Sequence, residues 1–259
     1  MSISRIQLSG KANYRKIEGN IDFYELFQKI EREFNNCFYL ESLGVENYDS
    51  RYSIIGFDPE IVLTGKKDSL QVNNKVYSTP NPYYELRNLI PSNVLSRNYS
   101  GGLVGYIGYD AMNYFEPSLN LKKHNHFEKF MFGVYEDGLV LDKMTGEVFY
   151  FHYDKDRFEK VKKLISSKYH LPQNPKIKAI GHSMTKEEHG EKVLAAIEEI
   201  KAGNTFQCQI GFKSEFEISG ASLPLYSELR QVNPSPHMFY LKFSGNKLIG
   251  ASPELLFRL

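Results

Sequence analysis

Two short segments, far apart in the chain, carry the residue types that a binding site for a free amino acid requires. Such a site needs an apolar slot for the side chain, hydrogen-bond donors for the carboxylate and acceptors for the ammonium group. Leu40 and Ser42 can supply an apolar wall and a hydroxyl, while Pro236 and Met238 can extend the wall. Taken alone, these residues favour a simpler interpretation, packing at strand ends, and only the fold can bring the segments together.

Other chemically capable residues have spacings that indicate no catalytic or metal site. The glycines of residues 101–108 lack the Lys-Ser/Thr of a phosphate-binding loop and the spacing of a dinucleotide fingerprint. We therefore expect a strand that approaches another backbone closely. His124 and His126 lie in a charged loop, and His182 and His189 flank a predicted helix start, so we predict no metal site.

Composition is that of an ordinary globular protein. The chain has 259 residues, 41% of them hydrophobic, which is enough for one large domain or two small ones. The net charge of +1 indicates no nucleic-acid partner, and no apolar run approaches the ~20 residues of a membrane helix. Residues 1–16 show no signal peptide, so we expect a cytoplasmic protein. Cys37 and Cys208 form no CxxC unit, and we expect both to be reduced, buried thiols.

Hydrophobic periodicity predicts an α+β chain with antiparallel groups of strands. Asp22 and Glu25 have capping-box spacing, and apolar residues recur on one face from Phe23 to Phe34, which predicts a first helix. Further elements are expected as strands at 37–41, 51–57, 60–65 and 101–110, a hairpin turning at Asn73-Asn74 and a short helix near 83–89.

The rest of the chain contains one long hairpin and one strongly patterned helix. The hairpin is expected over 131–142 and 147–153, followed by a helix that Asp154 caps. Residues 170–183 have two prolines and no helical period, which favours a boundary there. Later elements are a helix with a Thr185–Glu188 capping box and an apolar stripe at Val193, Leu194, Ile197 and Ile200, a strand at 206–216, a helix at 223–231, and strands at 237–243 and 247–251.

Five segments, taken in order, resemble the large subunit of anthranilate synthase. Each is weak alone, but their order over residues 40–254 is specific to chorismate-utilising enzymes of this branch. Departures from the family pattern at Asn204, residues 208–211 and His237 concern substrate-side details of the strand expected at Gln207. The segments are Leu40-Glu41-Ser42 with RYSIIG at 51–56, GGLVGYIGYDAMNYFE at 101–116, IKAGNTFQ at 200–207, NPSPHMFY at 233–240 and GASPE at 250–254.

The resemblance implies a fold of antiparallel β-sheets in a sandwich with helices outside. It implies that residues 1–170 form an N-terminal region with a regulatory site for L-tryptophan, and that residues 171–259 begin the chorismate-binding catalytic region. Two distant segments would meet to form the tryptophan site, and the residues assigned to it are Leu40, Glu41, Ser42, Asn233, Pro234, Pro236, His237 and Met238.

The implied reaction converts chorismate and ammonia to anthranilate and pyruvate, the first committed step of L-tryptophan biosynthesis. A partner subunit, the glutamine amidotransferase called component II, would supply the ammonia, and Mg²⁺ would assist at the ring carboxylate. In the family, the Mg²⁺ ligands and the acid/base histidine lie mostly beyond the segment that matches 250–254, so we expect them beyond Leu259. The chain stops inside an apolar run, and we expect it to be a truncated sequence.

Gln207 is the residue of this segment assigned to the active-site wall. Relatives that add water to chorismate have a lysine here as a base, whereas a glutamine cannot take a proton at neutral pH, which favours ammonia as the nucleophile. A neutral strand residue that bonds its neighbour is the simpler alternative. Two other functions stay open: 4-amino-4-deoxychorismate synthase, and a non-catalytic tryptophan-binding module if the chain truly ends at Leu259.

Overall fold

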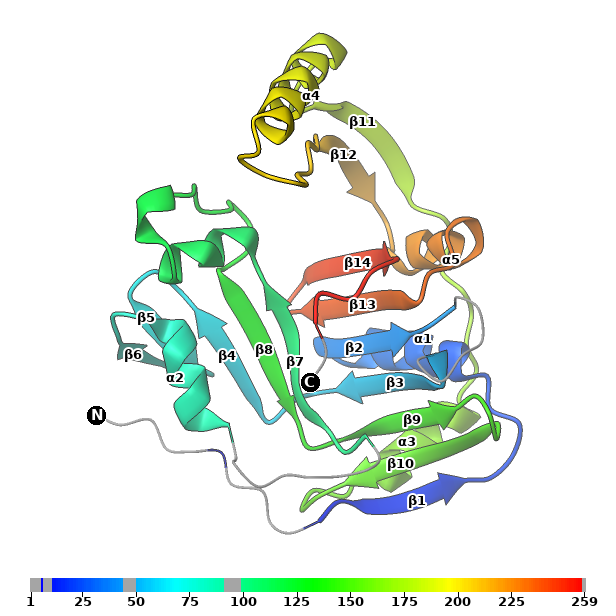
Figure 1. Cartoon of the computed structure of the whole chain (residues 1–259). Coiled ribbons are helices and arrows are strands. Elements are labelled where there is room, and N and C mark those ends of the chain that lie inside the picture. The colour runs from blue at the N-terminus through cyan, green and yellow to red at the C-terminus, as the bar shows by residue number, and fades with distance from the viewer. Residues whose placement is uncertain (1–5, 7–10, 44–49, 91–98, 258–259) are drawn as a thin grey trace. The chain divides into compact units, whose positions relative to one another are not determined.

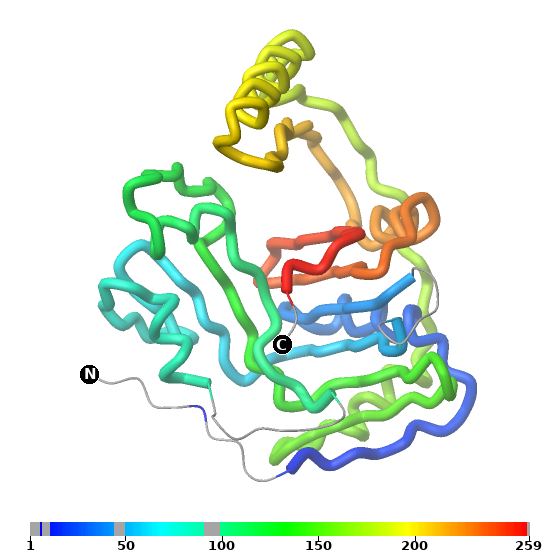
Figure 2. Tube along the Cα trace, in the orientation of Figure 1, coloured from blue at the N-terminus to red at the C-terminus, as the bar shows by residue number. Residues whose placement is uncertain are grey.

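The computed structural model describes residue 6 and residues 11–43, 50–90 and 99–257. The chain forms two compact units, one of Met1–His170 with Tyr226–Leu259 and one of Leu171–Leu225. The first unit is built on two antiparallel sheets with helices packed against them, as Figures 1 and 2 show. The predicted α+β fold with antiparallel sheets is therefore confirmed.

The larger sheet brings the two ends of the sequence together. Among the described residues it has seven strands in the order β1-β10-β9-β3-β2-β13-β14, and each neighbouring pair is antiparallel. The strands β2 and β13 are direct neighbours in this sheet (Figure 1). The bounds are β1 Asn13–Ile17, β2 Asn36–Glu41, β3 Tyr52–Phe57, β9 Asp137–Asp142, β10 Glu147–His152, β13 His237–Phe243 and β14 Asn246–Ser252.

The second sheet of this unit has the order β6-β5-β4-β8-β7 in the described part of the chain. Buried Phe38 and Leu241 of the larger sheet pack in one cluster with Tyr135 of the second, and Val104 and Met131 of β7 and β8 lie against that cluster. The two sheets therefore share an apolar core. The bounds are β4 Ile61–Gly65, β5 Ser69–Val72, β6 Lys75–Ser78, β7 Gly102–Ile107 and β8 Phe130–Tyr135.

Helices lie on the outer sides of the sheets. The helices α1 and α3 lie on the face of the larger sheet that points away from β7 and β8 (Figure 1). The helix α5 packs on the larger sheet through Tyr226, whose ring centroid is 5.7 Å from that of Tyr240 in β13. Leu86 and Leu89 of α2 pack with Leu63 of β4. The bounds are α1 Phe23–Glu33, α2 Pro82–Leu89, α3 Phe158–Ser166 and α5 Leu223–Val232, with the 3₁₀ helices η2 Tyr109–Tyr114 and η3 Pro117–Leu119.

The first helix forms for the reasons that its sequence predicts. The Asp22 carboxylate accepts a hydrogen bond from the Glu25 backbone N–H at 2.9 Å, which satisfies a donor at the helix start. Apolar residues of one face, including Phe27, are buried against the sheet. The Phe27 ring stacks on Tyr39 at 4.9 Å and meets Tyr240 edge-on at 5.2 Å. These contacts fix α1 on the strands β2 and β13.

The second unit contains β11 (Lys176–His182), α4 (Lys186–Lys201) and β12 (Ser214–Ser219). The strands β11 and β12 pair antiparallel. The predicted capping box of α4 is confirmed, because the Thr185 hydroxyl accepts from the Glu188 N–H and the Glu188 carboxylate accepts from the Thr185 N–H. No residue of α4 is buried among those the structure describes, and Leu194 of the predicted apolar stripe is 65% exposed.

Three of the expected elements are wrong in detail. The strand expected over 131–142 is broken at Glu136, so that its halves belong to different sheets. The helix after β10 starts with Arg157 at the N-cap, and the carboxylate that accepts its Phe158 N–H is Asp156 rather than Asp154. The strand expected at 206–216 exists only as Ser214–Ser219.

Two further expectations concern single features of the chain. Cys37 is buried as expected, but Cys208 is exposed, so the expectation of two buried thiols is wrong for Cys208. Cys208 lies in the stretch before β12, which is neither strand nor helix at this position. Among the helices that the structure describes, none has the length and apolar character to span a bilayer.

Candidate functional site

The structure brings together the two segments that were assigned to an amino-acid site. In the register of β2 and β13, Glu41 lies opposite Met238 and Leu40 opposite Phe239. Beyond the strand ends, the Leu43 N–H donates to the Ser235 carbonyl at 2.9 Å. The segment 40–42 and the segment 233–238 are therefore hydrogen-bonded neighbours. The sequence alone could not show that these two segments meet.

The side chains of this junction are divided between the two faces of the sheet. Successive residues of a strand point to opposite faces, and directly paired residues share a face. Glu41 and Met238 therefore share the face covered by α1, where they are 5% and 1% exposed. Leu40 lies on the opposite face and packs toward the core between the sheets. Leu40 and Met238 therefore do not form one wall as the sequence suggested, because their side chains lie on opposite faces of the sheet.

The Glu41 carboxylate is buried and is bound by three side chains. One oxygen accepts from the Tyr226 hydroxyl at 2.8 Å and from Arg230 Nε at 2.6 Å. The other oxygen accepts from the Tyr39 hydroxyl at 3.0 Å and from Arg230 Nη2 at 3.0 Å. A charge taken out of water needs such partners, because an unpaired carboxylate in a protein interior is strongly unfavourable. The network ties the end of β2 to α5.

Burial and the carboxylate both affect the titration of these partners. Burial raises the pKa of the Tyr226 hydroxyl, and the negative charge of Glu41 raises it further. Burial by itself would lower the pKa of the Arg230 guanidinium, but the hydrogen bonds and charge of Glu41 outweigh this effect and raise it. Both groups therefore keep their protons throughout the physiological range and remain hydrogen-bond donors to Glu41.

Ser42 offers an unused hydrogen-bonding group at the same place. The residue is 5% exposed, and among the described residues its buried hydroxyl has no hydrogen-bond partner. Leaving a buried polar group unpaired costs about 1–3 kcal/mol, which a ligand that bonds the hydroxyl would recover. The Ser42 carbonyl accepts from Lys143 Nζ at 2.6 Å, and the Lys143 N–H donates to the Arg51 carbonyl at 2.9 Å. Arg51 begins the RYSIIG stretch that the family resemblance pairs with Ser42, whereas Lys143 belongs to none of the five segments.

The other residues assigned to this site lie between α5 and β13. Asn233 ends the helix, since its N–H donates to the Leu229 carbonyl at 3.0 Å. Asn233, Pro234 and Pro236 are exposed, and His237 begins β13 with a partly buried side chain. The loop therefore presents an accessible surface beside the buried hydroxyl of Ser42.

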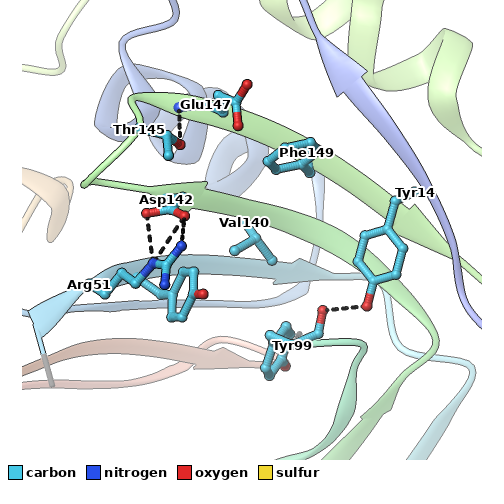
Figure 3. A pocket seen from close by; sticks show the side chains of 9 residues that line it. Tyr14, Arg51, Tyr99, Val140, Asp142, Thr145, Glu147 and Phe149 are labelled. Atoms are coloured by element: carbon cyan, nitrogen blue, oxygen red, sulfur yellow. Dashed lines mark hydrogen bonds and ion pairs between the residues drawn. The ribbon is translucent and has the colours of Figure 1, made fainter. Parts of the chain in front are cut away.

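A cavity of about 370 Å³ lies on the Leu40 face of the same sheet (Figure 3). Phe149, Val140, Ile54 and Leu40 are paired in succession across β10, β9, β3 and β2, which places the cavity walls and Leu40 on one face. Small-molecule sites combine such apolar walls with a few placed polar groups. The cavity is lined by Tyr14, Arg51, Tyr52, Tyr99, Val140, Asp142, Thr145, Glu147 and Phe149.

One charged edge of this cavity is the ion pair of Arg51 and Asp142. Arg51 donates from Nε to both carboxylate oxygens of Asp142 at 3.0 Å and from Nη2 at 2.5 Å (Figure 3). These hydrogen bonds lower the pKa of the Asp142 carboxyl. On the other side, the Tyr14 hydroxyl donates to the Tyr99 carbonyl at 3.1 Å. The cavity thus combines aromatic and apolar walls with an ion pair, which are features of small-molecule sites.

Gln207 lies in the second unit and not in a strand, contrary to expectation. The residue is exposed, and its carbonyl accepts from the Thr205 hydroxyl at 2.9 Å. Because β12 begins only at Ser214, the stretch that carries Gln207 has no pairing strand to fix its side chain. In the part of the chain that the structure describes, no three His, Cys, Asp or Glu residues are grouped so as to hold a metal ion.

Comparison with known proteins defines the class to which this fold belongs. Residues 20–259 match the family described as chorismate binding enzyme. The chain therefore belongs to the chorismate-binding enzyme family. A solved structure of anthranilate synthase component I from Streptococcus pneumoniae TIGR4 has a TM-score of 0.59 over 82% of this chain and 52% of its own, at 22% identity, which shows the likeness of fold.

Among similar sequences are several named anthranilate synthase component 1. That of Leptospira biflexa is 45% identical over 264 residues, covering 100% of this chain and 57% of its own length. That of Methanothermobacter thermautotrophicus is 33% identical, covering 91% of this chain and 51% of its own length. The chain thus spans about half the length of the relatives it matches.

Proposed function

We propose that this chain is part of the large subunit of an anthranilate synthase, which converts chorismate and ammonia to anthranilate and pyruvate. The observation that carries the proposal is the family match over residues 20–259 together with 45% identity along the whole chain to a protein named for this activity. Under this proposal the second unit, Leu171–Leu225, belongs to the region that binds chorismate.

The proposed nucleophile is ammonia, and the residue that supports this choice is Gln207. A neutral amide cannot remove a proton from water, whereas ammonia needs no such base to attack the ring. We propose that the ammonia comes from glutamine through a separate amidotransferase subunit, component II. Mg²⁺ is the metal expected for this chemistry, but the described residues offer no group of ligands that fits it. We therefore assign no step of the reaction to a metal held by these residues.

The product distinguishes this function from its nearest alternative. The purified full-length protein, given chorismate, an ammonium salt and Mg²⁺, should release anthranilate and pyruvate in equal amounts, measured by anthranilate fluorescence and a coupled pyruvate assay. A 4-amino-4-deoxychorismate synthase would instead form an aminated product without pyruvate, and that outcome would overturn the proposal. Omitting the ammonium salt should stop both products, and adding component II with glutamine should restore them.

We further propose that L-tryptophan regulates this enzyme by binding at the junction of β2 and β13. The unpaired hydroxyl of Ser42 and the neighbouring loop 233–236 support a site for a small polar group, and the Glu41 carboxylate is the acceptor nearest in sequence. Tryptophan inhibits only if it binds the inactive arrangement more tightly than the active one, and a twentyfold preference corresponds to roughly 1.8 kcal/mol. A few hydrogen bonds at this junction can supply that difference.

Substitution of Ser42 tests this regulatory site. We expect Ser42→Phe to fill the space beside the loop and to abolish inhibition, and Ser42→Ala to weaken it because only the hydroxyl is lost. The measurement is the ratio of activities with and without tryptophan, which does not depend on the uninhibited rate. Ser78→Phe, at an exposed position that ends β6 in the other sheet, is the matched control and should keep normal inhibition. Unchanged inhibition in Ser42→Phe would contradict the site.

A further inference from the structure

We infer that the effector's ammonium group and the helix α5 compete for the Glu41 carboxylate. On this inference, which rests on the proposed tryptophan site, an ammonium group can bind Glu41 only by displacing a donor that now holds α5 in place. The competition would make Glu41 the point at which occupancy of the site changes the attachment of a helix. It follows from counting the donors around one buried side chain.

The acceptor positions of Glu41 are all occupied. An ionised carboxylate has about four lone-pair positions, two on each oxygen. Within the described part of the chain, one oxygen receives the Tyr226 hydroxyl and Arg230 Nε, and the other receives the Tyr39 hydroxyl and Arg230 Nη2. These four hydrogen bonds, of 2.6–3.0 Å, leave no position for a fifth donor. An arriving ammonium must therefore replace one of them.

The donor whose displacement would loosen α5 most readily is the Tyr226 hydroxyl. Arg230 donates two hydrogen bonds to Glu41, and its guanidinium lies over the Tyr24 ring, 4.1 Å from the ring centroid. Such charge-assisted bidentate pairs are stronger than a single hydrogen bond from a neutral group. Tyr226 donates a single bond from a neutral group. Tyr39 also donates a single bond, at a longer 3.0 Å, but it belongs to β2 itself and its displacement would leave α5 attached.

Displacing the Tyr226 hydroxyl would weaken the docking of α5. The Tyr226 side chain is 0% exposed and is surrounded by the rings of Tyr24, Tyr39 and Tyr240 at 5.7–6.2 Å. A hydroxyl released into such an apolar environment has no water to bond, so the displacement carries a free-energy penalty. That penalty can be relieved by a shift of the helix that carries Tyr226. Binding energy at Glu41 is thereby converted into strain on α5.

The position of α5 in the chain gives this strain a consequence for function. Tyr226 is the first residue after the second unit, Leu171–Leu225, so α5 is the segment by which the chain returns from that unit. The other end of α5 leads directly into the loop 233–236 of the proposed tryptophan site. A change in α5 is therefore transmitted by covalent connection both to the effector loop and to the unit proposed to bind chorismate.

Removal of the Tyr226 hydroxyl separates binding of the effector from its effect. In the full-length protein, Tyr226→Phe vacates one position on Glu41 in advance, so the ammonium no longer has to displace a donor. We expect calorimetry to show tryptophan binding about tenfold tighter, equivalent to ~1.4 kcal/mol. We expect the greatest inhibition that saturating tryptophan achieves to fall. A merely structural role of Tyr226 predicts neither tighter binding nor this split between affinity and inhibition.

A matched control and a second variant keep the test decisive. Tyr150→Phe removes the same group from another buried carboxylate of the same sheet, that of Asp137 at 2.8 Å, and should leave tryptophan affinity unchanged. Tyr39→Phe vacates a position on the other oxygen of Glu41, and it should also tighten binding and reduce inhibition. If Tyr226→Phe does not fold, Tyr39→Phe decides the question.

The outcomes also separate this inference from the proposed function on which it rests. Tryptophan affinity that is unchanged or weaker in the folded variants would overturn the competition. Tighter binding with undiminished inhibition would overturn the role of α5. If the unsubstituted protein binds no tryptophan although it produces anthranilate, the proposed regulatory site fails, and the competition fails with it while the proposed enzymatic activity stands.

Discussion

Tyr135 and Asp137 flank a single residue, Glu136, yet they belong to different sheets. Tyr135 ends β8 of the five-stranded sheet, and Asp137 begins β9 of the seven-stranded sheet. The Glu136 carbonyl accepts from the Tyr153 N–H at 3.1 Å, which holds the chain at this corner. Burial raises the pKa of the Glu136 carboxyl, and the nearby charges of Glu60 and other acids raise it further. An acid with a raised pKa favours the folded state only when it is protonated.

The first prediction is that Glu136→Gln stabilises the protein at neutral pH. A carboxyl whose folded pKa is raised contributes stability that is fully present below its unfolded pKa of 4.5 and is lost as the pH rises through the folded pKa. The amide imitates the protonated form, so the gain should be greatest near pH 7 and vanish toward pH 4. Because the group is partly exposed, we expect roughly 0.5 kcal/mol, measured by urea unfolding at several pH values.

The control for this prediction is Glu147, a carboxylate whose pKa is lowered rather than raised. The Glu147 side chain is partly exposed, and its hydrogen bond from Lys16 at 2.8 Å lowers the pKa of its carboxyl. Glu147→Gln should therefore give a small loss of stability at pH 7, or none, and never a gain. A stability gain of Glu136→Gln that does not change between pH 7 and pH 4 would show that charge at the corner is not its cause.

The corner at Glu136 shows what the sequence can and cannot predict about this fold. Most helices and strands were predicted within a few residues, because their caps and apolar periodicity are local signals, as in α1 with Asp22 and α4 with Thr185. Residues 131–142 carry one continuous strand-like pattern, and no local residue signals a change of sheet. The break depends on where the partner strands β4 and β3 end, which is a property of the tertiary structure.

The candidate site was predictable as two motifs but not as a geometry. The family resemblance selected the segments that hold Glu41 and Met238, and the register of β2 and β13 makes those two residues direct partners. The partners of Glu41 on α5, Tyr226 and Arg230, belong to no motif and are 185 and 189 positions away. Which face of the sheet each side chain occupies follows from the register, and a shift of one residue would reverse it.

The second prediction concerns the ion pair that anchors α3. Arg157 donates to both oxygens of Asp137, with Nε at 2.9 Å, and to Asp58 at 2.6 Å. The side chains of Arg157 and Asp137 are 10% and 6% exposed. Arg157→Met would leave the Asp137 carboxylate buried without its cation, and we expect a loss of about 3–5 kcal/mol in the free energy of unfolding by urea.

A surface ion pair of the same helix region is the control for this loss. Arg15 bonds Asp156 at 2.5 Å, but the two side chains are 46% and 33% exposed. Solvent-exposed pairs contribute about 0–1 kcal/mol, so Arg15→Met should change stability by no more than that. Equal losses in the two variants would mean that burial does not determine the strength of the Arg157 pair.

The third prediction concerns Gly105, where the glycine-rich strand meets its neighbour. A Cβ added to Gly105 would lie 1.9 Å from the Met131 carbonyl oxygen and 2.7 Å from the Phe132 Cα, both backbone atoms of β8. The expected close approach of this strand to another backbone is thus confirmed. Gly105→Ala must push β7 away from β8, and we expect a loss of about 3 kcal/mol or more, seen as a lower thermal midpoint.

The same substitution in open space should have the opposite effect. Gly190 lies inside α4, and among the described residues no atom other than its chain neighbours and the backbone of its own helical turns is within 4 Å of the Cβ that an alanine would add there. Alanine favours a helix over glycine by about 1 kcal/mol, so Gly190→Ala should stabilise α4. A tolerated Gly105→Ala would show that β7 and β8 are not packed as closely as their register indicates.

The fourth prediction is that the two cysteines react at very different rates. Cys37 is 0% exposed, and burial raises the pKa of its thiol to about 12, so almost no thiolate is present at pH 8. Cys208 is exposed and lies outside any strand or helix. A thiol reagent should therefore label Cys208 within minutes and Cys37 only after the protein is denatured. Cys208→Ser should remove the fast phase, and fast labelling that persists in that variant would show that the β2 face opens to solvent.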